Sequence, residues 1–214
     1  MRDSYGGENL SEDLLKMNGL STKLLASLSY PVADGISLKR TLRSVSKELL
    51  LQDVISMTEW LDRQEILQQL SLDCRIKSVD SIEDKYCRYL DSGRPIRKVF
   101  NDILGFRAFC WDYASVLAIN IPNFRVVDMS GGKSHDDGYR GVHVYFQLDG
   151  RHYPIEIQFN TFYDRQLNNW LHDYLYKQED SNFVGQQLRI YYEEGKIRNE
   201  SDFQEALKHV LSNR

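Results

Sequence analysis

The stretch from Gly138 to Thr161, GYRGVHVYFQLDGRHYPIEIQFNT, restricts the possible folds of this chain more than any other segment. Asp149-Gly150 predicts a two-residue type I′ turn, which needs positive φ at both central residues, between the strands of a β-hairpin. The register then follows outward from the turn. The predicted pairs are Leu148 with Arg151, Phe146 with Tyr153, Val144 with Ile155, and Val142 with Ile157.

One face of this hairpin carries chemically reactive groups. Side chains alternate across a strand, so the four pairs form an apolar face and the residues between them form a polar one. The polar pairs are Gln147 with His152, Tyr145 with Pro154, and His143 with Glu156, and Gln158 follows Glu156 on the same side. A slip by one residue would bury this polar set, so the hydrophobic pattern specifies the register. The sequence therefore predicts an imidazole opposite a carboxylate.

Composition excludes several classes of protein. The 214 residues are 42% hydrophobic and 27% charged, which is typical of a globular chain with one substantial core. A net charge of −4 argues against a nucleic-acid coat but allows a local basic patch. Three cysteines without C-x-x-C spacing disfavour both a disulfide framework and a zinc site. The sequence shows neither a signal peptide nor an apolar run of about 20 residues, so we expect a soluble, cytoplasmic protein that contacts no membrane.

Helical and strand patterns alternate along the chain and predict an α/β (α+β) fold, with a mixed sheet flanked by helices. We expect an N-terminal helical region over 1–70, a core over 71–177 and C-terminal helices over 178–214, in one compact domain. Pro31 divides the first region, and a second amphipathic stretch runs from about Ser37 to Leu67. The core predictions are a helix from Ser81 to Ser92-Gly93, strands over 103–110 and 124–129, a short helix over 111–119, a loop over 130–138 and a helix over 162–177. Residues 73–77 are too few to assign.

Other polar residues are typical of phosphate chemistry. Asp102, at the head of the strand 103–110, could converge with Glu156 on one divalent cation. Two hard oxygen ligands suit Mg²⁺, which keeps several waters and is completed by substrate phosphates. Arg75, Lys77 and Lys85 would offset the charge of a polyphosphate.

Each of these residues also has a plainer interpretation. An Asp ahead of a glycine is usually a turn or cap residue, and cations along a helix usually form a solvated face. Tyr139 could stack on a base or only anchor its glycine-flanked loop. His143 and Glu156 could be a cross-strand polar pair contributing about 0.2–1 kcal/mol. The order and the co-occurrence of the residues favour the functional interpretation.

Five motifs occur in order along the chain. They are R-x-K at Arg75, S-x-x-x-K at Ser81, D-x-x-G-x-R at Asp102, G-Y-R-G-V-H at Gly138 and E-I-Q-F-N-T at Glu156. Together they resemble the synthetase domain of RelA/SpoT alarmone enzymes, over about residues 75–177, and W-L-H-D-Y-L-Y-K at 170–177 also fits. The resemblance implies a nucleotidyltransferase-like fold and a small single-domain member without a hydrolase domain.

The same resemblance implies an ATP pyrophosphokinase, which transfers the β,γ-pyrophosphate of ATP to a ribose 3′-hydroxyl and releases AMP. By motif, Asp102 and Glu156 would be catalytic and would hold Mg²⁺. The implied ATP ligands are Arg75, Lys77, Ser81, Lys85 and Arg107. The implied acceptor ligands are Tyr139, His143 and Gln158. Glu156 could also activate the hydroxyl.

Two residues depart from the family pattern. Gly141 stands where serine is typical, and Asn160 where an arginine would help to hold the 5′-phosphates of the acceptor. Both resemble the toxic small branch of the family, some members of which modify the 3′ end of tRNA. Four cations spaced for one helical face would suit a tRNA backbone or form only a solvated surface: Lys39, Arg40, Arg43 and Lys47.

Three functions follow from these observations. The sequence favours transfer to the tRNA 3′ end by a toxin with a neutralising antitoxin as partner. The alternative is a small alarmone synthetase that uses guanine or adenine nucleotides as acceptors. A catalytically degenerate nucleotide-binding regulator comes third. The sequence does not set the oligomeric state.

Overall fold

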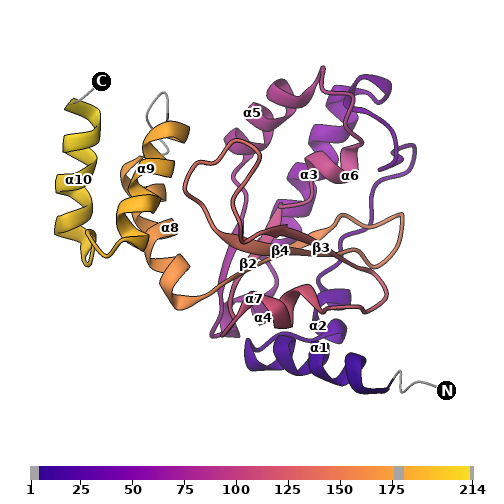
Figure 1. The fold of residues 1–214 in the computed structure, drawn as a ribbon. Coiled ribbons are helices and arrows are strands. Elements are labelled where there is room, and N and C mark those ends of the chain that lie inside the picture. The colour runs from indigo at the N-terminus through magenta and orange to yellow at the C-terminus, as the bar shows by residue number, and fades with distance from the viewer. Residues whose placement is uncertain (1–4, 176–180, 213–214) are drawn as a thin grey trace. The chain divides into compact units, whose positions relative to one another are not determined.

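The computed structural model describes residues 5–175 and 181–212 (Figure 1). The helices are α1 (Tyr5–Met17), α2 (Thr22–Ser27), η1 (Leu42–Ser44, a 3₁₀ turn), α3 (Lys47–Asp62), α4 (Glu65–Gln69), α5 (Val79–Tyr89), α6 (Ile96–Val99), α7 (Tyr113–Leu117), α8 (Phe162–Tyr174), α9 (Ser181–Glu193) and α10 (Glu200–Ser212). The strands are β1 (Asp73–Ile76), β2 (Leu104–Phe109), β3 (Phe124–Met129), β4 (Gly141–Phe146) and β5 (Ile155–Asn160). Among these described residues, no helix has the length and apolar character needed to cross a membrane.

The strands form one five-stranded sheet in the order β1-β2-β5-β4-β3. The predicted mixed α/β class, with helices flanking the sheet, is confirmed. Strand β1 comes from the segment that was too short to assign. It forms by antiparallel pairing with β2, which sets Asp73 opposite Arg107 and Arg75 opposite Gly105. Arg75 in β1 and Lys77 directly after it are therefore positioned by the pairing with β2, which the local sequence does not reveal.

The chain divides into two compact units. The first comprises Met1–Ala108, Ala118–Val126 and His143–Gln158, and the second Phe109–Leu117, Val127–Val142 and Phe159–Arg214. In the view of Figure 1, α3, α5 and α6 lie above the strands of the first unit and α1 and α2 lie below them. The predicted regions 1–70, 71–177 and 178–214 remain a prediction.

The apolar face of the hairpin packs into the core as its alternation predicts. In β4, Val144 and Phe146 are fully buried, whereas His143 and Tyr145 are half-buried. In β5, Ile155 and Ile157 are fully buried. The His143 ring reaches the Glu156 carboxylate directly, so the predicted cross-strand pairing is confirmed.

The predicted type I′ turn is wrong. Strand β4 ends at Phe146 and β5 begins at Ile155, so the connection is much longer than two residues. Neither Asp149 nor Gly150 has a positive φ. Instead, the N–H of His152 donates to the Asp149 carbonyl oxygen over 3.3 Å.

The reason lies in another part of the chain. The N–H of Val32 donates to the Arg151 carbonyl oxygen over 2.8 Å, and the N–H of Tyr153 donates to the Tyr30 carbonyl oxygen over 3.1 Å. The backbone groups of Arg151 and Tyr153 therefore bond to residues 30 and 32, and not to the opposite strand of the hairpin. The Tyr153 hydroxyl also donates to buried Asp53 of α3 over 2.8 Å, which holds this arm against the core.

Two predicted helix starts also need correction. The helix expected at Ser81 begins at Val79, because Ser78 is the N-cap and its hydroxyl accepts a hydrogen bond from the Ser81 N–H. The helical stretch expected from Ser37 starts only with η1 and α3, where Ser46 is the N-cap. A serine caps a helix three residues before the N–H that it binds, and the prediction at Ser81 missed this offset.

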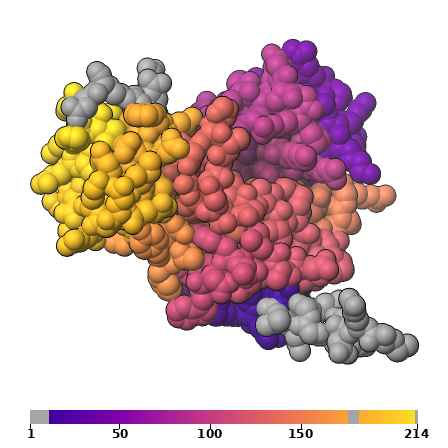
Figure 2. All heavy atoms as spheres, viewed as in Figure 1, coloured from indigo at the N-terminus to yellow at the C-terminus, as the bar shows by residue number. Residues whose placement is uncertain are grey.

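In the second unit, α8, α9 and α10 pack around a common apolar core. Figure 2 shows the outer surface of these helices in orange to yellow. Its members include Trp170, Leu171, Leu188, Tyr192 and Phe203. These residues recur at helical spacing, and the predicted helix over 162–177 and the predicted C-terminal helices within 178–214 are confirmed over the described residues.

Candidate functional site

A pocket of about 70 Å³ in the first unit collects most of the predicted ATP and metal ligands. It is lined by Arg75, Lys77, Asp102, Gly105, Phe106, Arg107, Glu156 and Gln158. Strands β1, β2 and β5 lie side by side in the sheet and supply nearly all of this lining. We call this space the carboxylate pocket.

Asp102 lies between two ammonium groups. Lys85 Nζ donates to Asp102 Oδ1 over 2.7 Å, and Lys77 Nζ lies 3.1 Å from Oδ2. All three side chains are largely buried. The N–H of Lys77 also donates to the Ile103 carbonyl oxygen over 2.8 Å, which fixes the lysine beside the head of β2. The predicted grouping of Lys77, Lys85 and Asp102 is thus present in the structure.

Glu156 is buried and fully hydrogen-bonded. Its Oε1 accepts from His143 Nδ1 and from the Tyr145 hydroxyl, both over 2.9 Å, and its Oε2 accepts from Gln158 Nε2 over 2.7 Å. Burial raises the pKa of the Glu156 carboxyl, but the hydrogen bond and charge of His143, with the bonds from Gln158 and Tyr145, outweigh it and hold the pKa below its ordinary value. Glu156 is therefore an anion at neutral pH.

This lowered pKa has a consequence for stability. A carboxyl whose pKa is depressed by folding stabilises the protein above its unfolded-state pKa and loses that contribution as the pH falls through the folded-state pKa. We expect the difference in unfolding free energy between wild type and Glu156→Gln to shrink as the pH falls below about 4.5. Urea unfolding at a series of pH values measures it. A difference that stays constant down to about pH 3 would contradict the assignment.

The carboxylate pocket fits a magnesium ion by its donor chemistry. It contains two carboxylates, Asp102 and Glu156, and a Cβ at Gly105 would stand 3.7 Å from Glu156 Oε2, so the glycine leaves that oxygen uncovered by a longer side chain. Within residues 5–175 and 181–212, no three His, Cys, Asp or Glu side chains cluster as a metal site. A metal bound by two carboxylates would complete its shell with water and phosphate oxygens, as Mg²⁺ commonly does.

The other predicted ATP ligands differ in position. Arg75 and Arg107 line the carboxylate pocket, and Arg107 Nη1 lies 3.1 Å from Asp73 Oδ2. Ser81 is not among the lining residues. Its hydroxyl accepts a hydrogen bond from Ser78 over 2.9 Å, in the first turn of α5 and one turn before Lys85.

Tyr139 lies in the second unit, in a loop that buried contacts hold in place. Arg189 Nε donates to the Gly138 carbonyl oxygen over 2.8 Å. Gly138 has a φ of +84°, and a Cβ there would overlap the carbonyl oxygen of Gly185 in α9. The Tyr139 ring is half-buried, with Lys133 Nζ 4.9 Å from its centre. Both the stacking and the anchoring interpretation of Tyr139 remain predictions.

The two departures from the family pattern are in contact. A Cβ on Gly141 would lie 2.5 Å from Asn160 Nδ2 and 2.7 Å from the Tyr139 hydroxyl oxygen. Asn160 is buried, and its Nδ2 donates to the Arg140 carbonyl oxygen over 2.8 Å. Asn160 thus occupies the space that a side chain at 141 would need. Sequence alone could not link two residues on different strands.

The predicted basic helical face is wrong. Lys39 and Arg40 lie in a non-helical segment, Arg43 is in η1, and Lys47 begins α3. The segment forms a turn, in which the Arg40 N–H donates to the Ser37 carbonyl oxygen over 2.9 Å. The N–H groups of residues 96 and 97 donate to the carbonyl oxygens of residues 40 and 38 and hold this turn against α6. Arg43 is bound to Asp91, and Lys47 Nζ lies 5.5 Å from the centre of the Tyr86 ring.

Sequence analysis missed two contributors to these sites. Tyr145, paired only with Pro154 in the predicted register, is a direct hydrogen-bond donor to Glu156. Arg189 is 1% exposed and holds the Tyr139 loop. Of the motif at 170–177, His172 is exposed and bound to Asp173, while residues 176 and 177 lie outside the described residues.

No protein-family model matches the chain, and no curated protein sequence matches it. The structure is similar to small alarmone synthetase 1 from Bacillus subtilis bound to its product pppGpp, with 21% identity over 76% of this chain and 92% of that chain and a TM-score of 0.41. It is also similar to a GTP pyrophosphokinase family protein from Streptococcus pneumoniae, with 20% identity over 75% and 96% and a TM-score of 0.39. It is also similar to small alarmone synthetase 2 from Bacillus subtilis, with 20% identity over 77% of this chain and 92% of that chain and a TM-score of 0.36.

Proposed function

We propose that this protein is an ATP pyrophosphokinase, which transfers the β,γ-pyrophosphate of ATP to the 3′-hydroxyl of a nucleotide. The observation that carries the proposal is the carboxylate pocket, where Asp102 and an ionised Glu156 lie with Arg75, Lys77 and Arg107. Two hard anions among several cations suit a metal-bound triphosphate better than a neutral ligand. The five ordered motifs point to the same chemistry.

In the proposed reaction the acceptor 3′-oxygen attacks the β-phosphorus of ATP. The bond from that phosphorus to the oxygen bridging the α- and β-phosphates breaks, and AMP leaves with the oxygen. Asp102 and Glu156 would hold Mg²⁺, which would offset the negative charge of the phosphates. Lys77 and Lys85 pair with Asp102 and add positive charge beside the phosphate chain.

His143 and Tyr145 have a positioning role in this proposal. Both donate hydrogen bonds to Glu156 Oε1, so they fix the carboxylate and keep it charged. The Oε2 atom lies on the side of Gly105. The ionised carboxylate can draw the proton of the 3′-hydroxyl as the new bond forms. Positioning and electrostatic stabilisation supply most of the catalysis in such phosphoryl transfers.

For the acceptor we propose a free guanine nucleotide, with the tRNA 3′ end as the second candidate. The tRNA interpretation rested on Gly141, Asn160 and the basic helical face, and that face does not form. The motifs as a whole resemble those of alarmone synthetases, for which guanine nucleotides are the ordinary acceptors. An antitoxin partner belongs only to the tRNA candidate.

A labelling experiment tests both statements. The protein is incubated with γ-labelled ATP and Mg²⁺ together with GDP, GTP, an adenine nucleotide or total tRNA in separate tubes. We expect AMP and a labelled guanine nucleotide. Label on tRNA alone would reverse the choice of acceptor. If ATP binds but no acceptor is labelled, the protein is a nucleotide-binding regulator and the proposed activity is wrong.

Tyr139→Ala should weaken acceptor use without changing ATP binding. A base stacked on an aromatic ring contributes about 1–3 kcal/mol, so KM for the acceptor should rise about 5- to 150-fold. Tyr139→Phe is the matched control, because it keeps the ring and should keep KM. Steady-state kinetics with varied acceptor measure the effect. An unchanged KM in Tyr139→Ala would leave Tyr139 as a loop anchor only.

A further inference from the structure

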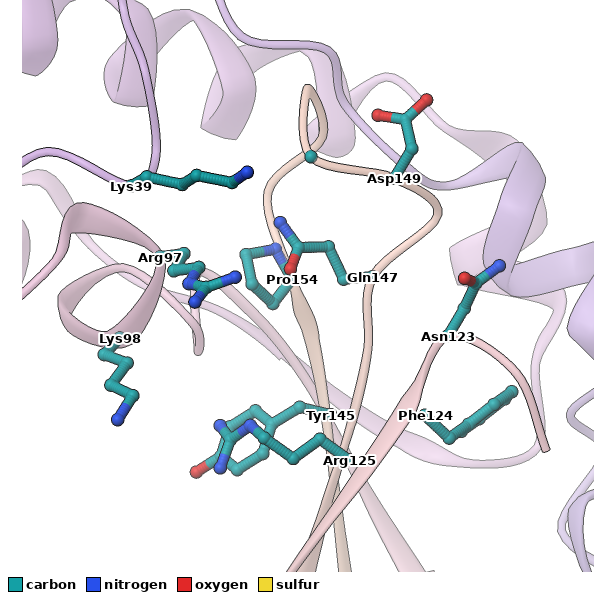
Figure 3. Close-up of a pocket in the computed structure, with 11 residues that line it drawn as sticks. Lys39, Arg97, Lys98, Asn123, Phe124, Arg125, Tyr145, Gln147, Asp149 and Pro154 are labelled. Carbon is teal, nitrogen blue, oxygen red and sulfur yellow. The ribbon is translucent and has the colours of Figure 1, made fainter. Parts of the chain in front are cut away.

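A second pocket, of about 450 Å³, lies in the first unit (Figure 3). It is lined by Lys39, Arg97, Lys98, Asn123, Phe124, Arg125, Tyr145, Gln147, Asp149, Gly150 and Pro154. None of these residues lines the carboxylate pocket. We call this space the basic pocket. Its volume is within the range typical of small-molecule sites.

Four cations line the basic pocket: Lys39, Arg97, Lys98 and Arg125. In the part of the chain that the structure describes, none of the four forms an ion pair. In Figure 3, Lys39 and Arg97 reach towards Pro154 and Gln147. Positive charges gathered at one pocket repel one another, and a bound anion relieves that repulsion.

The acidic side chain in the lining does not neutralise these cations. Asp149 Oδ1 accepts from the Arg151 N–H and lies within hydrogen-bonding distance of His152 Nδ1, both at 2.7 Å. Its carboxylate points away from the cations in Figure 3. The remaining lining side chains are neutral, so the pocket has a strongly positive interior surface.

One of the four cations is already held in position. The Arg125 guanidinium lies 4.3 Å from the centre of the Tyr145 ring, a cation–π contact that orients its donors. A planar guanidinium binds phosphate oxygens through two parallel hydrogen bonds, and a fixed one loses less entropy on binding. Arginine and lysine together, in a concave site, recognise a chain of phosphates.

Tyr145 joins the two pockets. Its ring lines the basic pocket, and its hydroxyl donates to Glu156 Oε1 in the carboxylate pocket. A ligand that displaces Arg125 or presses on this ring would change the hydrogen bonding of Glu156. Occupancy of the basic pocket and the state of Glu156 are therefore coupled through one side chain.

We propose that the basic pocket binds an oligophosphate anion, the di- or triphosphate chain of a free nucleotide, and that Tyr145 transmits its presence to Glu156. The binding part of this inference does not rest on the proposed function. Two sources of such a chain fit the chemistry: the acceptor itself, and a separate effector nucleotide. The pocket is concave and of small-molecule size, which favours a free nucleotide over the backbone of an RNA.

Binding of inorganic tripolyphosphate, measured by titration calorimetry on the full chain, tests the site. The pocket variant is Arg97→Gln with Lys98→Gln, both on exposed, unpaired side chains of α6. Because the carboxylate pocket can also take tripolyphosphate, a second variant, Lys77→Gln with Lys85→Gln, removes the two ammonium groups beside Asp102. Arg63→Gln, an exposed cation outside both pockets, is the control.

Two binding events are expected for wild type and for the control. The pocket variant should weaken one of them about ten- to a hundredfold, and the Lys77/Lys85 variant should weaken only the other. Unchanged binding in the pocket variant, with its circular dichroism spectrum also unchanged, would overturn the proposal. Weakened binding of tRNA together with normal binding of tripolyphosphate would overturn it in favour of an RNA site.

Kinetic measurements then distinguish the two sources of the oligophosphate chain, the acceptor and a separate effector nucleotide. If the pocket holds the phosphates of the acceptor, the pocket variant raises KM for GDP but not for guanosine. If an effector binds there, tripolyphosphate changes kcat of wild type at saturating GDP, and the pocket variant no longer responds. Absence of any transfer activity would contradict the proposed function and leave the calorimetric result standing.

Discussion

Replacing Glu156 with glutamine should lower the rate of pyrophosphate transfer by about 10²–10⁴-fold while the protein stays folded. The change removes the charge that would hold the metal and attract the proton of the 3′-hydroxyl. It keeps the volume of the side chain and an oxygen that can accept the hydrogen bonds of His143 and Tyr145. The rate of AMP release from labelled ATP, in the presence of acceptor, measures the loss.

Two further variants give a control and a parallel test for Glu156→Gln. Glu83→Gln neutralises an exposed carboxylate on α5 and should transfer pyrophosphate at the wild-type rate. Asp102→Asn should lose activity as Glu156→Gln does, since Asp102 is the other carboxylate of the pocket. Full activity of folded Glu156→Gln would remove the basis for the carboxylate pocket as the reaction centre.

The second large effect is expected at Arg189, which should cost about 3–5 kcal/mol of stability when replaced by methionine. Arg189 is 1% exposed and donates to Asp164 Oδ1 over 2.7 Å and to the Gly138 carbonyl oxygen over 2.8 Å. Methionine fills similar space but leaves the Asp164 carboxylate buried without its cation. Urea unfolding, with Lys208→Met as an exposed control on α10, measures the change.

A double variant separates charge from packing in this network. If the cost comes from the unpaired carboxylate, Arg189→Met with Asp164→Leu should be more stable than Arg189→Met alone, because both charges are then gone. If the double variant is less stable by the sum of the two single changes, packing rather than charge explains the loss. Tyr113 also donates to Asp164, so Asp164→Leu alone is expected to destabilise the second unit.

Local hydrophobic periodicity correctly predicted which side chains pair within the hairpin, because that pairing depends on only two strands. The alternation in 142–158 placed His143 opposite Glu156, because burial of one face fixes every side chain of the hairpin. The turn at Asp149 was not predictable in the same way. Its geometry depends on Tyr30 and Val32, more than a hundred residues earlier in the chain, whose backbone groups pair with the arm before β5.

The carboxylate pocket was predictable because its residues belong to the ordered sequence motifs. Arg75, Asp102 and Glu156 were expected together and share a pocket, since their strands are neighbours in the sheet. The basic pocket was not expected. Its cations come from the segment near 39, from α6 and from β3, and no spacing in the sequence relates those segments. Lys39 was noticed only as part of a helical face that does not form.

The contact between Gly141 and Asn160 makes position 141 intolerant of a single substitution. A Cβ there would lie 2.5 Å from Asn160 Nδ2 and 2.7 Å from the Tyr139 hydroxyl oxygen, so a serine at 141 would displace both groups and disturb the bond from Asn160 to the Arg140 carbonyl oxygen. A smaller residue at 160 would relieve only the first of these contacts, because the Tyr139 hydroxyl would still lie against the new side chain. An exchange of glycine for serine at 141 is therefore coupled to at least two other side chains, and made alone it should not be neutral.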